Sequence, residues 1–213
     1  MRGASSTARK SSRFSNSRYY AVGALLNLAF ASPRNRDALA AERALEGVAD
    51  CAAAAAGDLD QQRLCCRAFW ILATPVATPV DKGAAPRPAA AALSDARLAV
   101  VPAAMLAFAE DRALQHFACG AIINLAAAST DARRALGRVD GCRAVAGALR
   151  AYPRDARIAE YACRAAVYLA RGDPENKDLF FRFGVRALAE KTAALFAATP
   201  AVAAWADRLQ REL

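Results

Sequence analysis

The sequence holds few side chains that could carry out catalysis. His116 is the only histidine, and no serine, cysteine or aspartate recurs at a spacing that would complete a catalytic triad with it. Neither a glycine-rich phosphate loop nor a His-Glu-x-x-His zinc motif is present. We therefore expect a protein that is not an enzyme and has no cofactor or metal site. Catalysis is the weakest of the alternatives.

The six cysteines lack the spacing of a zinc site, because none belongs to a Cys-x-x-Cys pair. Cys66, Cys119 and Cys163 instead occupy the same place in a repeated segment, where another copy has Val22. A place filled by Cys or Val is typical of a small apolar core residue, so we expect buried, reduced thiols. Since no secretory leader is evident, we expect an intracellular protein, cytoplasmic or nuclear.

One nine-residue segment occurs four times and aligns without gaps. The seventh residue of each copy is taken as position zero, and the copies are separated by steps of 44, 53 and 44 residues. All four copies have alanine three residues before and two residues after position zero, and leucine one residue after it. Internal similarity at near-equal steps is the signature of a repeat protein. Position zero is occupied by Asn27, Ile71, Asn124 and Tyr168.

These segments are best positioned by helices. More than a quarter of the residues are alanine, while isoleucine and threonine are scarce, which favours helix over sheet. At 100° per residue, the places six, five and two before position zero and one and two after it share one face. That face is apolar in nearly every copy and predicts burial. The places seven and four before zero, and zero itself, lie opposite.

Shorter helices are expected before each repeated helix. Ser32 and Pro33 are suited to the cap and first turn of a helix that opens the segment 33–56. Residues 200–212 are expected to form a terminal helix that follows the repeat poorly. The same plan recurs over two later segments, 129–150 with a break at Gly141 and 173–199 with a break at Gly184.

Two segments fall outside this plan. Residues 1–17 are rich in serine and arginine and lack acids, so we expect a disordered basic tail, of targeting type or regulated by phosphorylation. Residues 74–88 contain four prolines, so we expect a mobile surface loop. The repeat domain then covers 18–213, with a partial repeat at 18–31 and full repeats at about 32–73, 89–127, 129–171 and 173–213.

The unit of about 42–44 residues, with an Ala-x-x-Ala-x-x-Asn-Leu-Ala third helix, resembles the armadillo repeat over 18–213. The resemblance implies an all-α fold, a right-handed armadillo-type α-solenoid of about four three-helix repeats, with third helices lining a concave groove. It also implies that Asn27 and Asn124 bind the backbone of an extended peptide, whereas Ile71 and Tyr168 depart from the pattern. A HEAT-like repeat of two helices per unit is the alternative, and the glycine breaks favour three.

The chemistry of the groove face also follows from its residue types. Asn offers donors and an acceptor to any peptide backbone, glycine allows close approach, aromatic rings are frequent anchors, and arginine favours an acidic ligand. Each type also has a structural explanation, as helix packing or solvated surface. The candidate peptide-binding residues are Tyr20, Gly23, Asn27, Arg67, His116, Phe117, Gly120, Asn124, Tyr161, Arg164 and Tyr168.

We therefore expect a non-catalytic scaffold that binds a partner protein or an extended, partly acidic peptide. Binding of nucleic acid or another acidic surface through the basic tail is the alternative, because residues 37–213 carry little of the net charge of +9. No apolar run long enough to span a membrane is present. Since the first repeat is partial, we expect either a longer parent protein or a partner that covers the open apolar face.

Overall fold

The computed structural model describes residues 4–74 and 93–213, with side chains from Asn16 onward. Within these residues all regular structure is helical, which confirms the all-α prediction. The expected loop at 74–88 lies outside the described residues except for Thr74, as does the beginning of the repeat expected at 89–127. No helix among the residues described combines the length and the apolar character that crossing a bilayer requires.

Most of the helices fall into triplets of increasing length. Three triplets have a first helix of 9 residues, a second of 11 and a third of 13 to 15. These triplets are α2 (Pro33–Ala41), α3 (Ala44–Ala54) and α4 (Leu59–Leu72); α9 (Thr130–Arg138), α10 (Gly141–Ala151) and α11 (Ala156–Ala170); and α12 (Pro174–Arg182), α13 (Val185–Leu195) and α14 (Pro200–Glu212). The remaining helices are α1 (Ala4–Ala29), α6 (Asp95–Leu98), α7 (Val100–Ala107) and α8 (Arg112–Ala128).

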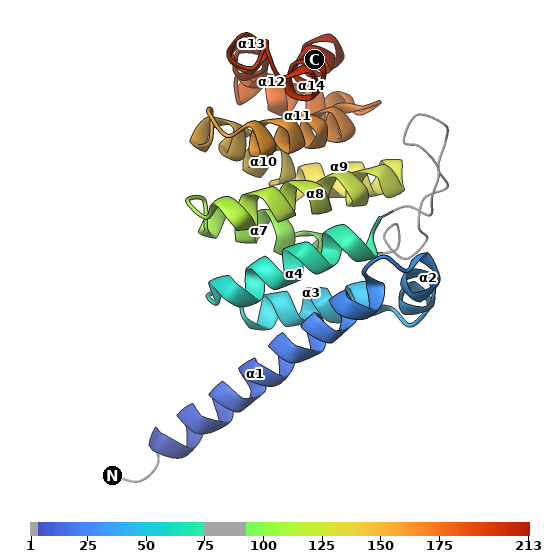
Figure 1. The fold of residues 1–213 in the computed structure, drawn as a ribbon, viewed down its shortest axis with the longest axis vertical. Helices are drawn as coiled ribbons and strands as arrows, with labels where there is room; N and C mark the ends of the chain where they lie inside the picture. The colour runs from blue at the N-terminus through green and yellow to red at the C-terminus, as the bar shows by residue number, and fades with distance from the viewer. Residues whose placement is uncertain (1–3, 75–92) are drawn as a thin grey trace.

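The long helices α1, α4, α8, α11 and α14 pack on one another in chain order, each against the next. Figure 1 shows the helices layered along the longest axis of the molecule. Their inner faces form one continuous core, in which Cys66, Cys119 and Cys163 are buried as expected. Burial raises the pKa of the Cys119 and Cys163 thiols to about 12, so both remain protonated.

Side-chain caps start the helices at equivalent places in the repeat. Ser32 Oγ accepts a hydrogen bond from the Asn35 amide at 3.3 Å, so the predicted start of α2 is confirmed. The third helices are capped by aspartates that lie thirteen residues before position zero in three copies. These are Asp58, Asp111 and Asp155, whose Oδ1 atoms accept from the amides of Gln61, Leu114 and Ile158 at 3.1, 2.8 and 3.0 Å.

The breaks between first and second helices use left-handed residues. Gly184 has a φ of +67°, which confirms the predicted break between α12 and α13. At the other predicted break the left-handed residue is Asp140, with a φ of +64°, and Gly141 is the first residue of α10. Gly141 is needed for a different reason, because a Cβ there would lie 2.5 Å from the carbonyl oxygen of Leu136.

The two ends of the chain compare differently with the sequence prediction. Helix α1 begins at Ala4, so residues 4–17 continue it outward from the body instead of forming a disordered tail (Figure 1). No proline or glycine interrupts residues 4–18, which permits the extension. At the other end, α14 packs on α11 as the other long helices pack on one another, although Asp207, Leu209 and Gln210 depart from the repeat as expected. Trp205, Arg208 and Leu213 hold the places seven and four before, and one after, position zero.

Candidate functional site

The candidate surface lies on the long helices α1, α4, α8, α11 and α14. It is formed by the residues at position zero and at the places four and seven before it, and is here named the long-helix face. On α1 and α4 it contains a hollow of about 590 Å³, here named the α1–α4 hollow. Four predicted residues meet there, although 40 residues separate Asn27 from Arg67 in the sequence. The lining consists of Tyr19, Tyr20, Gly23, Ala24, Leu26, Asn27, Phe30, Leu64 and Arg67.

The α1–α4 hollow is open to solvent. Tyr20 is 71% exposed and Phe30 is 63% exposed. A Cβ at Gly23 would meet nothing within 4 Å, so the helix backbone is accessible there. The side chain of Asn27 has no hydrogen-bond partner, and that of Arg67 no carboxylate partner, among the residues that the structure describes. The polar groups of this hollow are therefore available to a ligand.

On α8, α11 and α14 the same face is filled by an aromatic–arginine stack. His116 and Tyr161 pack edge to face with centroids 4.7 Å apart, and Trp70 lies 5.3 Å from each. The Arg164 guanidinium is 5.4 Å from the Tyr161 centroid and 5.0 Å from that of Trp205. The stack comprises Trp70, His116, Phe117, Tyr161, Arg164, Trp205 and Arg208.

Two predicted groove residues are occupied by the chain itself. Gly120 is buried, and a Cβ there would lie 2.7 to 2.9 Å from three atoms of the Trp70 indole. Glycine at this place therefore accommodates Trp70. Asn124 Nδ2 donates to the carbonyl oxygen of Trp70 at 2.6 Å and to Thr74 Oγ1 at 3.2 Å. The Asn124 amide thus closes the carboxyl end of α4.

Tyr168 does not line the face as the sequence predicts. Its side chain is 8% exposed and belongs to the core, because α12 and α14 both pack against α11. Of the eleven candidates, the structure therefore places Tyr20, Gly23, Asn27 and Arg67 around one open hollow. It places His116, Phe117, Tyr161 and Arg164 in the stack, and Gly120, Asn124 and Tyr168 beneath or within the packing.

No protein-family model, curated protein or solved structure matches this chain.

Two small hollows border the stack at His116. One of about 250 Å³ lies between α8 and α11, and one of about 430 Å³ reaches α14; both are lined by His116 and Arg157. His116 Nε2 is buried without a hydrogen-bond partner among the described residues. Burial lowers the pKa of His116, and the nearby Arg157 lowers it further. The neutral imidazole is therefore favoured inside the stack.

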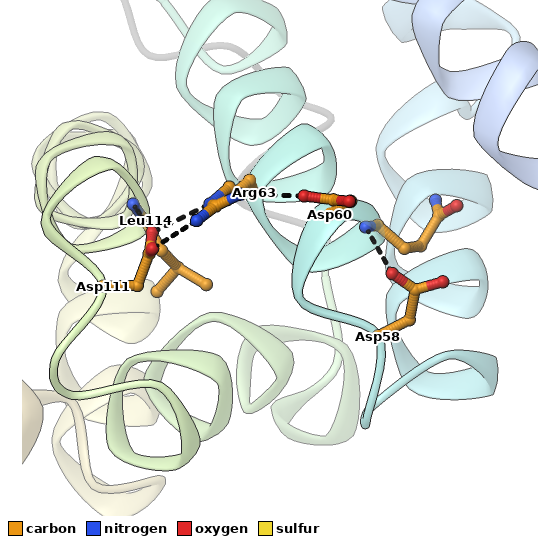
Figure 2. A network of polar contacts seen from close by, with 6 residues as sticks. Asp58, Asp60, Arg63, Asp111 and Leu114 are labelled. Carbon is orange, nitrogen blue, oxygen red and sulfur yellow. Dashed lines mark hydrogen bonds and ion pairs between the residues drawn. The ribbon is translucent and has the colours of Figure 1, made fainter.

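Ion pairs hold the amino ends of neighbouring long helices together. Arg63 of α4 donates from Nε to Asp111 Oδ1 at 2.9 Å, and from a terminal nitrogen to Asp60 at 2.8 Å (Figure 2). Asp111 caps α8 at Leu114 with the same carboxylate (Figure 2). The hydrogen bond from Arg63 holds the pKa of Asp111 below its ordinary value. Arg112 pairs with the α11 cap Asp155 in the same manner, so this device fixes three successive helices.

The sequence prediction missed three members of the stack. Trp205 and Arg208 occupy the same places on α14 as Tyr161 and Arg164 on α11, so a further 44-residue step would have identified them. Trp70 lies one residue before position zero, where the other copies have Leu, Ile and Val. The repeat pattern contains no signal that a residue at this place reaches the face.

Proposed function

We propose that this chain is a right-handed armadillo-type α-solenoid that acts as a non-catalytic scaffold and binds an extended peptide of a partner protein on its long-helix face. The triplets of 9, 11 and 13 to 15 residues support a three-helix unit over the two-helix unit of a HEAT-like repeat. The chain-order packing of the long helices supports a stacked array.

The α1–α4 hollow is the observation that carries the proposal. It brings Asn27 and Arg67 together with exposed aromatic rings of Tyr20 and Phe30. An Asn amide can donate to and accept from a peptide backbone of any sequence, while the rings offer contact area at low entropic cost. Exposed large apolar side chains clustered around accessible polar groups are typical of a protein-binding surface.

A selection experiment tests this function. A phage-displayed library of random 12-residue peptides is panned against the full chain, and the enriched peptides are synthesised and measured by fluorescence anisotropy. We expect enriched peptides to lose about tenfold in affinity with the double variant Tyr20→Ala and Asn27→Ala, corresponding to about 1.4 kcal/mol. The melting temperature should not change, because both side chains are exposed.

Phe181→Ala is the matched control. Phe181 is 77% exposed on α12 and does not line the α1–α4 hollow, so its loss should leave peptide affinity unchanged. Failure to enrich any peptide, or an equal loss of affinity in the control, would overturn the proposal.

A further inference from the structure

We infer that the peptide is bound at the α1–α4 hollow alone, and that it is an extended segment with a carboxylate placed at Arg67 beside an apolar side chain. This inference rests on the proposed function and specifies both its location and its ligand. Two observations support it. One half of the long-helix face is filled by the chain's own side chains, and the half that stays open carries an exposed arginine.

The stack closes the half formed by α8, α11 and α14. A peptide backbone cannot approach Gly120, because the Trp70 indole already lies against it. Nor can it accept hydrogen bonds from the Asn124 side-chain amide, because Nδ2 already donates to the Trp70 carbonyl oxygen and to Thr74 Oγ1. The groups that an extended chain would use on α8 are therefore already engaged within the molecule.

The arginines four places before position zero on α4 and α11 also differ in whether their charge is already paired within the molecule. Arg164 of α11 lies between the rings of Tyr161 and Trp205, and its guanidinium is 3.7 Å from the Glu160 carboxylate. Arg67 of α4 is exposed, with one ring contact to Phe117 at 5.8 Å and no ion pair within the described part of the chain. Of these two arginines, Arg67 alone has no ion-pair partner in the part of the chain that the structure describes.

The lining of the α1–α4 hollow complements an acidic, partly apolar ligand. Among the described residues that line it, Arg67 is the sole charged one and no acid is present to repel a carboxylate. Tyr20 and Phe30 expose aromatic surface beside it, which an apolar side chain of the ligand would cover. Asn27 lies on the same wall and can bond to the peptide backbone. A carboxylate next to an apolar side chain on an extended segment satisfies all three features.

A charge-swap selection tests this inference. Two phage libraries of eleven-residue peptides, one with a fixed central Glu and one with a fixed central Lys between random flanks, are panned against the full chain and against Arg67→Glu. We expect the wild type to enrich the Glu library and Arg67→Glu to enrich the Lys library. The best Glu peptide, synthesised with a fluorescent label, should lose about tenfold or more in affinity with Arg67→Glu.

Arg208→Glu is the matched control within the chain. Arg208 occupies the same place on α14 and also lies over a ring, 5.1 Å from the Trp205 centroid, but in the closed half. This variant should keep the preference for the Glu library and change the affinity less than twofold. Circular dichroism checks that both variants are folded, and Arg67→Ala replaces Arg67→Glu if the latter is not.

The outcomes separate this inference from the proposed function. If neither library is enriched, the proposed function itself fails. If peptides are enriched but their affinity depends on Arg208 and not on Arg67, the function stands and the inference is overturned. Sedimentation velocity of the chain without peptide tests whether a second copy of the chain fills the hollow. A dimer that Arg67→Glu abolishes would show this and would overturn the inference.

Discussion

The two halves of the long-helix face carry similar residues at equivalent places but differ in how these residues are used. Tyr20 on α1 is mostly exposed, whereas Tyr161 on α11 is packed against Trp70. Asn27 faces the open hollow, whereas Asn124 donates to α4. A repeated place therefore determines the direction in which a side chain points, and the neighbouring helix determines whether a partner can reach it.

Trp70 accounts for most of this difference. It contacts His116, Phe117 and Tyr161 through its ring, covers Gly120, and accepts from Asn124 through its carbonyl oxygen. The α1 residue at the equivalent place is Leu26, which is buried and has no ring to extend over α4. One large side chain at the boundary thus divides an open region from a closed one.

Removing Trp70 should produce the largest effect. We expect Trp70→Ala to lower the free energy of unfolding by about 3 kcal/mol or more, because truncation of a packed Trp loses both apolar burial and the edge-to-face contacts. Tyr20→Ala should change it by less than about 0.5 kcal/mol, since most of that ring is already in solvent. Urea denaturation of both variants makes the comparison, and equal losses would refute the division into two halves.

Adding volume at one repeated alanine should have the next largest effect. Ala121 on α8 is completely buried, while Ala24 at the same place on α1 is exposed and lines the hollow. We expect Ala121→Leu to cost about 1–3 kcal/mol of stability through overpacking. Ala24→Leu should leave stability unchanged but partly fill the hollow and weaken any bound peptide. Thermal melts and anisotropy measure the two effects, and a stability loss in Ala24→Leu would contradict the open hollow.

Replacing each of the two asparagines at position zero by alanine should lower the free energy of unfolding by amounts that differ by about 1 kcal/mol. Asn124→Ala removes two donors from the carboxyl end of α4 and leaves the Trp70 carbonyl oxygen without this partner, which we expect to cost about 1 kcal/mol of stability. Asn27→Ala should not change the melting temperature and should weaken peptide binding instead. An unchanged melting temperature in Asn124→Ala would show that the hydrogen bond contributes nothing to stability.

Much of the helical layout could be predicted because it depends on local chemistry. Ser32 caps the helix that Pro33 begins, and Gly184 adopts the left-handed conformation that ends α12. Cys66 and its equivalents are buried because a small apolar place recurs on one helical face. The sequence also predicts the terminal helix α14 and its poor match to the repeat, because Leu209 stands where the other copies have alanine, although Trp205 keeps the aromatic place.

The closed half of the face could not be predicted, because it depends on contacts between distant segments. The Trp70 ring lies against Gly120, and Thr74 accepts a hydrogen bond from Asn124. Both partners lie some 50 positions earlier in the chain. An Asn or Gly in a repeat looks the same in the sequence whether it meets solvent or a neighbouring ring. The sequence does not reveal that the Trp70 ring reaches this face, because the residues at the equivalent place in the other copies are aliphatic.

The smallest expected effect is a pH dependence that arises at His116, inside the closed half. Burial and the neighbouring Arg157 and Arg112 lower its pKa, while Asp155 raises it. The folded chain therefore binds this proton less readily than the unfolded chain, whose histidine has a pKa of about 6.5. As the pH falls through about 6.5 toward the lowered pKa, the unfolded state takes up the proton first and the free energy of unfolding decreases.

His116→Gln isolates this contribution. We expect the wild type to lose more stability than His116→Gln when urea denaturation at pH 7.5 is compared with pH 5.5. The capping aspartates do not interfere, because the pKa values of Asp111 and Asp155 are lowered below 3.8 and both stay ionised over this range. Since α1 and α4 contribute no histidine, the open half should not change with pH, and a peptide bound through Arg67 should keep its affinity. An identical loss of stability in the two proteins would place the titrating group outside the stack.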